Sequence, residues 1–192
     1  MDNITVYNRK NPMTREHYAR LFEIMEYSFP ADERRDFEEQ FEEFRQPLFH
    51  CICRETADRV EGFMNYWDFT DFLYLEHFAV ARELRGQGIG TQFIRKIRSI
   101  ADGRPIILEA EPPELSEAAA SRIAFYERLG FTLNPHEYYQ PPYRSGEKPL
   151  RLVIMSDCGV LSQEDFLRMR SVLYREAYCT SEAFLPKAAD RR

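Results

Sequence analysis

The chain has 192 residues, 44% of them hydrophobic, and a formal net charge of −6. This length and composition favour one folded domain and exclude disorder as the default. An acidic chain binds nucleic acid poorly by bulk charge and tolerates a cationic small molecule or a basic peptide more readily. No apolar run approaches the roughly 18 residues of a membrane helix, and Met1-Asp2-Asn3-Ile4 lacks the form of a secretory signal. We therefore expect a cytoplasmic protein with no membrane or nucleic-acid partner.

The cysteines and histidines give no sign of a metal or redox centre. No two of Cys51, Cys53, Cys158 and Cys179 have CxxC spacing, so we expect four reduced thiols. The four histidines, at positions 17, 50, 77 and 136, form no ligand-spaced cluster, so we expect no metal.

Hydrophobic periodicity predicts the elements of the first half of the chain. Apolar residues at helical spacing in 13–29 indicate an amphipathic helix that Pro30 ends. The charged segment 33–45 is predicted as a solvated helix with a thin stripe of phenylalanines; an acidic wall beside a cationic substrate is the alternative. The predicted strands are 4–7, 48–54, 60–69 and 72–81, with a turn at Asp58-Arg59 between the second and third.

In the second half, strands and helices alternate. Ser116 is expected to cap a helix that ends near Leu129, before Gly130. Ser162 and Asp165 resemble a capping-box variant at the start of the last helix. The other predicted elements are a helix at 89–100, strands at 106–109, 131–133 and 151–156, a Tyr- and Pro-rich loop at 135–149, and a frayed tail after 185. Together they predict a mixed α/β domain with a central sheet.

The segment 85–91, Arg-Gly-Gln-Gly-Ile-Gly-Thr, joins an apolar strand to a helix. A helix N-terminus carries unpaired amides and partial positive charge, and glycines let a ligand approach the backbone closely. This pattern predicts a phosphate site. The dinucleotide fingerprint fails because Thr91 and Phe93 stand where glycines are needed, and no Lys-Ser or Lys-Thr pair completes a P-loop. A turn shaped for packing alone is the alternative.

Arg85-x-x-Gly88-x-Gly90, after a Phe-Ala-Val strand, resembles the acyl-CoA site of the GNAT superfamily of N-acetyltransferases. The segment 122–131, a helix carrying Phe125-Tyr126 and ending at Gly130-Phe131, resembles that superfamily's later motif. The resemblance implies an α/β fold in one GNAT domain over 1–192, with a mixed central β-sheet flanked by helices. Residues 157–192 would form a C-terminal helical extension.

The resemblance also implies transfer of an acetyl group from acetyl-CoA to an amine, which needs a base, an acid and an oxyanion donor. Tyr126 would protonate the thiolate, with a packed core aromatic as the alternative. A backbone amide near Val80 would polarise the carbonyl. The residues implied to bind acetyl-CoA are Phe78, Ala79, Val80, Arg85, Gly86, Gln87, Gly88, Ile89, Gly90 and Thr91.

Glu109 is the first candidate for the base, Glu76 the second and His77 the third. A carboxylate within an apolar run is costly unless it is paired, so each glutamate could instead be a salt-bridge partner. Many superfamily members carry Asn where this chain has Ala119, and residues 111–115 lengthen the path to the next helix. Both departures affect the expected geometry near Glu109.

Three alternatives stay open at this point. The donor could be another acyl-CoA, and the protein could instead be a non-catalytic CoA-binding sensor or an interaction module. The acceptor is expected to be a small amine or a peptide. The loop 138–144 could line the acceptor site, pack on the domain surface or contribute to a homodimer.

Overall fold

The structure is a computed structural model that describes residues 4–57, 59–144, 146–181 and 184–185. It divides into two units, Met1–Ile106 and Ile107–Arg192, each of which is described by itself. Asp58, half of the predicted turn, and the tail after residue 185 lie outside the described residues.

The first unit contains four antiparallel strands that pair in chain order. They are β1 (Ile4–Asn8), β2 (Phe49–Glu55), β3 (Val60–Asp68) and β4 (Leu73–Val80), which confirms the four predicted strands. Between β3 and β4 the register shifts: Asn65 pairs with His77 but Tyr66 pairs with Leu75. Glu76 is therefore the extra residue of a β-bulge, a feature that re-aims side chains.

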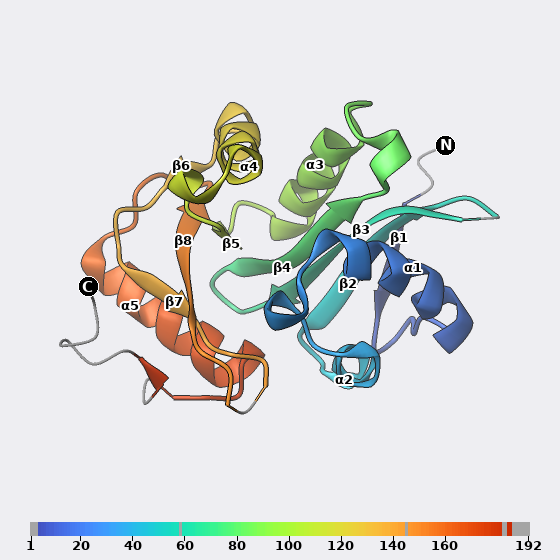
Figure 1. Cartoon of the computed structure of the whole chain (residues 1–192), viewed down its shortest axis with the longest axis horizontal. Coiled ribbons are helices and arrows are strands. Elements are labelled where there is room, and N and C mark those ends of the chain that lie inside the picture. Colours follow the sequence, from blue (N-terminus) through green and yellow to red (C-terminus); the bar gives the residue numbers. More distant parts are fainter. Residues whose placement is uncertain (1–3, 58, 145, 182–183, 186–192) are drawn as a thin grey trace. The chain divides into compact units, whose positions relative to one another are not determined.

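Two helices cover opposite faces of this sheet. Phe29, which caps the C-terminus of α1 (Arg15–Ser28), contacts the His77 ring at 4.9 Å, and Phe93 of α3 (Ile89–Ala101) contacts the Phe78 ring at 5.3 Å. Consecutive strand residues point to opposite faces, so α1 and α3 lie on opposite sides of β4 (Figure 1). The two helices predicted from periodicity are confirmed.

The charged segment 33–45 departs from its prediction. Instead of one helix it forms α2 (Phe37–Glu42) between two 3-10 turns, Ala31–Glu33 and Glu43–Arg45. Asp36 caps α2 and forms a capping box with Glu39, which makes Phe37 the first helical residue. The phenylalanine stripe packs against Tyr18, with ring centroids 4.9 to 5.7 Å away, so it belongs to the core.

In the second unit, the other strands pair with β8 (Leu150–Ser156). β5 (Ile106–Ala110), β6 (Thr132–Leu133) and β7 (Tyr138–Gln140) are all antiparallel to it. The segment 135–149, predicted as a loop, thus contains a strand. β6 pairs with only the last two residues of β8, which leaves 150–152 to pair with β7; Tyr138 and Gln140 are buried there.

The helices of the second unit follow the predicted caps. Ser116 accepts a hydrogen bond from the Ala119 amide at the start of α4 (Glu117–Arg128), and Ser162 does so from the Asp165 amide at the start of α5 (Gln163–Val172). α5 continues as a π-helical turn, Leu173–Ala177.

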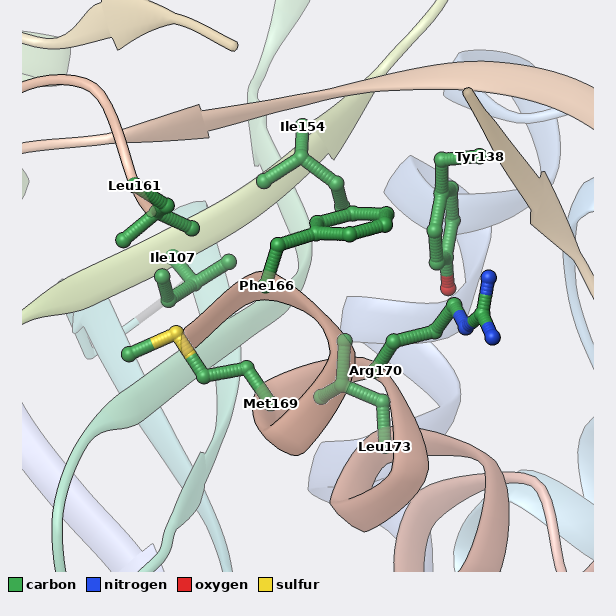
Figure 2. Close-up of a pocket in the computed structure, with 8 residues that line it drawn as sticks. All are labelled: Ile107, Tyr138, Ile154, Leu161, Phe166, Met169, Arg170 and Leu173. Atoms are coloured by element: carbon green, nitrogen blue, oxygen red, sulfur yellow. The ribbon is translucent and has the colours of Figure 1, made fainter. Parts of the chain in front are cut away.

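The last helix belongs to the core of the second unit. Figure 2 shows Phe166, Met169 and Leu173 of this helical segment directed at residues of β5, β7 and β8. The cavity that they enclose is only about 10 Å³, room for about one water molecule. The expected C-terminal extension is therefore a packed element that can hold other residues in place.

Candidate acyl-CoA loop and catalytic residues

The loop between β4 and α3 owes its shape to two glycines. Gly86 and Gly88 have φ angles of 77° and 78°, in the left-handed region that other residues avoid. A 3-10 turn, Arg82–Leu84, precedes them, and Gly88 is the N-cap of α3. The sequence pattern Arg85-x-x-Gly88-x-Gly90 thus corresponds to a real backbone reversal into a helix.

The start of α3 presents amide groups to the loop. Its first helical hydrogen bond runs from the Gln92 amide to the Gly88 carbonyl, 3.2 Å apart. The amides of Ile89, Gly90 and Thr91 precede that bond and have no intrahelical acceptor. Since Gly86, Gln87 and Gly88 are exposed, this helix end is open to a ligand. Such an end favours a phosphate group.

Arg85 fastens the loop to the end of β4. Its Nε atom donates to the Val80 carbonyl at 3.0 Å, and its Nη2 atom donates to Ser28 Oγ at 3.4 Å. Both bonds hold a permanent positive charge beside the exposed amides. Arg85 therefore has a structural role besides the anion-binding role that the motif implies.

The other implied donor-site residues lie at the end of β4. Val80 pairs with Gly62, and a Cβ added to Gly62 would come within 2.9 Å of the Ala79 carbonyl oxygen. Glycine is needed there because β3 approaches β4 so closely. Ala79 is buried, whereas Phe78 and Val80 are partly exposed. The ten residues implied to bind the donor therefore lie at the end of β4, in the loop and in the first turn of α3.

One feature of this region is not visible in the motif. An open hollow of about 600 Å³ is lined by Ile4, Gln92, Arg95 and Lys96, of which the last three belong to α3. Arg95 and Lys96 add two positive charges one helical turn beyond the loop. Their helical position could be inferred from the sequence, but β1 brings Ile4 beside them only in the folded chain.

In the second unit, Tyr126 lies on the inner face of α4 with 7% of its surface exposed. Its ring contacts Phe125 and Phe131 at 5.2 and 5.6 Å, edge to face. Burial raises the pKa of Tyr126 to about 12, against the opposing effect of Arg122. The phenol is therefore protonated at neutral pH, the form that a proton donor needs.

Glu109 of β5 accepts hydrogen bonds from two phenols. Tyr178 donates to Oε2 at 2.7 Å, and Tyr138 donates to Oε1. Hydrogen bonds from neutral donors stabilise an ionised carboxylate and fix its orientation. Tyr178 follows the π-helical turn after α5, so the helical extension reaches this candidate base. Sequence reasoning missed Tyr178, because no local pattern relates it to a residue so far away in the chain.

Glu76, in the first unit, has a different environment. Its side chain is fully buried and pairs with Arg35, with Oε1 and Nη1 2.6 Å apart. Burial alone would raise the pKa of Glu76, but Arg35 and His77 lower it to about 2. A carboxylate so strongly held by a cation is a weak base. His77 is 3% exposed and lies 3.0 Å from the Glu33 carbonyl, which matches the packed strand residue that sequence reasoning preferred.

All four cysteines are free, with Cys51 and Cys53 buried and Cys158 and Cys179 exposed. In the described part of the chain, no helix is both long and apolar enough to cross a bilayer.

Comparisons with known proteins identify the family and the fold. The sequence model of the acetyltransferase (GNAT) family matches residues 13–131. A solved structure of a GNAT-family protein from Bacteroides thetaiotaomicron is 36% identical, with a TM-score of 0.80, and the match covers 93% of this chain and 99% of that one. The expected fold class, α/β with a mixed central sheet flanked by helices, is thereby confirmed. The chain belongs to the GNAT family of acetyltransferases.

Two further relatives define what the likeness covers. YjbC of Bacillus subtilis, named provisionally as an acetyltransferase, is 32% identical over 65 residues, and the match spans only 33% of each protein. A solved aminoglycoside 6'-N-acetyltransferase in complex with coenzyme A has a TM-score of 0.56 at 19% identity, covering 80% of this chain and 94% of that one. At that identity the likeness extends to the fold alone.

Proposed function

We propose that the protein is an N-acetyltransferase that transfers the acetyl group of acetyl-CoA to a primary amine by direct attack on the thioester. The observation that carries this proposal is the loop at 85–91. Two positive-φ glycines and an open helix N-terminus form an anion site beside Arg85. The family supports acyl transfer, and a loop of this kind suits the pyrophosphate of CoA.

The donor side of the mechanism uses backbone groups. The pyrophosphate would accept hydrogen bonds from the amides of 85–91, with the Thr91 hydroxyl as a further donor. Arg95 and Lys96 give the hollow beside α3 a charge suited to the remaining phosphate of CoA. A backbone amide near Val80 would polarise the thioester carbonyl, because amide donors stabilise the oxyanion that forms on attack.

Attack by the amine and departure of the CoA thiolate would each need a proton transfer. The neutral amine attacks the carbonyl carbon, and the nitrogen gives up one proton to the base. The tetrahedral intermediate collapses, the carbon–sulfur bond breaks, and the departing thiolate takes a proton from Tyr126. Solvent returns the proton to Tyr126 and removes the other from the base. The products are the N-acetylated amine and CoA thiol.

We propose Glu109 as the base in preference to Glu76. Two phenols orient the Glu109 carboxylate, and each of its oxygens can accept more than one hydrogen bond. Glu76 is held by Arg35, and lowering its pKa to about 2 removes most of its driving force for accepting a proton. We assign Glu76 to the support of the β4 bulge.

The acceptor is proposed only as a class, a small primary amine or a peptide amine. An aminoglycoside is one member of that class, as the name of the solved relative illustrates. A net charge of −6 is compatible with a cationic acceptor and does not select among amines.

Calorimetric titration of acetyl-CoA tests the proposal. Wild type should bind at micromolar concentration, and the double variant Arg85→Glu, Gly88→Trp should not. Gly103→Trp is the matched control, because Gly103 also has a positive φ of 84° with open space at its Cβ position but lies after α3. An amine library would then be screened for CoA thiol release.

The alternatives predict other results. Binding of a longer acyl-CoA in preference to acetyl-CoA would change the donor. CoA binding with no thiol release for any amine would favour the sensor, and no binding by a folded wild type would favour the interaction module.

A further inference from the structure

Four side chains from three elements of the first unit converge at one place away from the acyl-CoA loop. They are Tyr7 of β1, His17 in the first turn of α1, and Cys53 and Glu55 of β2. Cys53 and Glu55 are two residues apart on a strand and so share a face. Thr14 caps α1 by accepting a hydrogen bond from the His17 amide at 3.2 Å. This bond fixes the backbone position of His17.

One nitrogen, one sulfur and one oxygen atom meet in this group. The ligand atoms of His17, Cys53 and Glu55 all lie within 4.8 Å of one another, and Cys53 Sγ is 3.9 Å from Glu55 Oε2. Bonds of about 2.0 to 2.3 Å to a tetrahedral ion place ligand atoms roughly 3.3 to 3.8 Å apart. Small rotations of the three side chains would therefore bring all three ligand atoms within bonding distance of one ion. In particular, the close contact between His17 Nε2 and Glu55 Oε2 would have to lengthen.

Tyr7 orients the side chains of His17 and Glu55. Its hydroxyl lies 3.3 Å from His17 Nδ1 and donates to Glu55 Oε1 at 2.9 Å. If Nδ1 carries the imidazole proton, Nδ1–H donates to the phenol oxygen, and the phenol O–H donates to the carboxylate. This arrangement directs the Nε2 lone pair of His17 and the Oε2 atom of Glu55 toward the same point. Hydrogen bonds of this kind characterise the surroundings of metal ligands.

We propose that His17, Cys53 and Glu55 form a zinc site. Imidazole, thiolate and carboxylate are the ligands that Zn²⁺ prefers, whereas Ca²⁺ and Mg²⁺ prefer oxygen alone. On binding, a zinc–sulfur bond forms and the Cys53 thiol releases its proton to solvent. The thiolate and the carboxylate then supply two negative charges against the two positive charges of the ion. Three protein ligands leave one position for water.

The cluster has the burial that such a site needs. The Cys53 side chain is buried, and those of His17 and Glu55 are 25% and 17% exposed, so the ion would enter from the solvent side. Bound zinc would link the first turn of α1 to β2. We therefore infer a structural ion that stabilises this face of the sheet, independent of acyl transfer.

The test uses the full chain with Cys158→Ser and Cys179→Ser, because these exposed thiols would otherwise bind metal themselves. Zinc is titrated in competition with a chromophoric chelator, and Co²⁺ serves as a spectroscopic probe. We expect one equivalent of zinc to bind at micromolar concentration or tighter. We also expect a thiolate-to-cobalt charge-transfer band and a melting temperature that rises with zinc.

Two variants and one control identify the ligands. Cys53→Ser and His17→Gln should each weaken zinc binding at least about tenfold, and Cys53→Ser should abolish the cobalt band. Cys51→Ser is the matched control, because Cys51 is a buried thiol on the same strand outside the cluster. Circular dichroism establishes that each variant is folded. The proposal is overturned if the background protein binds no stoichiometric zinc, or if folded Cys53→Ser and His17→Gln bind it as tightly as the background does.

Discussion

Tyr178, beyond the last helix, donates a hydrogen bond to Glu109 on β5, with Oη and Oε2 2.7 Å apart. Tyr138 of β7 donates to the other carboxylate oxygen. Tyr178 is held in turn by the packing of α5, and its ring lies 5.4 Å from that of Tyr143. The helical extension therefore takes part in orienting the proposed base.

Replacing Tyr178 with Phe should lower kcat about tenfold and leave the KM for acetyl-CoA unchanged. A hydrogen bond to a charged group contributes about 1.5 to 3 kcal/mol, and 1.4 kcal/mol corresponds to a factor of about ten. Steady-state kinetics measure the effect. Tyr139→Phe is the matched control, since that phenol donates to Glu137 and not to Glu109. Equal losses of kcat in both variants would mean that Tyr178 acts only through the stability of this region and not through its hydrogen bond to Glu109.

Replacing Tyr126 with Phe should lower kcat by about 10²-fold while the affinity for CoA stays within about twofold. General-acid catalysis contributes factors of this size, and the ring contacts of Tyr126 survive in Phe. Thiol-release kinetics and calorimetry separate the two quantities. Unchanged kcat would remove Tyr126 from the mechanism and leave it as a core aromatic.

Replacing Gly88 with Ala should raise the KM for acetyl-CoA and reduce the free energy of unfolding by about 1 to 2 kcal/mol. The cause of both is the φ angle of 78°, which a Cβ disfavours although no atom lies within 4 Å of its position. Gly103→Ala, with a φ of 84°, carries the same backbone cost outside the loop and should leave KM unchanged. A raised KM in both variants would refute a specific role for the loop.

Acid should weaken the contribution of Glu76 to stability. Burial raises its pKa and Arg35 more than offsets that effect, so its folded-state pKa is about 2 against an ordinary value of 4.5. Its stabilising contribution is complete above pH 4.5 and is lost as the pH falls toward 2. A pKa shift of this size corresponds to about 3 kcal/mol of the free energy of unfolding. Glu76→Gln should therefore destabilise the protein at pH 7, by an amount that shrinks between pH 4.5 and 2.

Urea unfolding followed by the fluorescence of Trp67, the single tryptophan, measures this dependence. Glu38→Gln is the control, because Glu38 also pairs with an arginine but 64% of its side chain is exposed. Exposed pairs contribute little, so this variant should resemble wild type at every pH. A Glu76→Gln effect that does not vary with pH would show that packing, and not charge, is what Glu76 supplies.

The secondary structure was predictable where local signals agreed. The helix at 89–101 has a single apolar stripe, and Ser116 and Ser162 cap the helices they were expected to cap. The predictions were wrong at 33–45 and 135–149. A capping box begins α2 only at Phe37, and β7 forms because β8 offers an unpaired edge. The pairing of β7 depends on β8, which follows only after the segment 141–149, so it leaves no local pattern within 135–149.

The amino-acid sequence by itself indicated the family and the helix-initiating loop at 85–91, because glycine spacing and helix periodicity act over a few residues. Only the tertiary structure distinguished the surroundings of the two candidate glutamates. Both glutamates lie in apolar strands, and the sequence could not reveal that Arg35 neutralises Glu76 whereas two phenols orient Glu109. The tertiary structure likewise brought His17 close to Cys53 and Glu55. The pKa and ligand capacity of a side chain depend on neighbours within a few ångströms, and folding alone selects those neighbours.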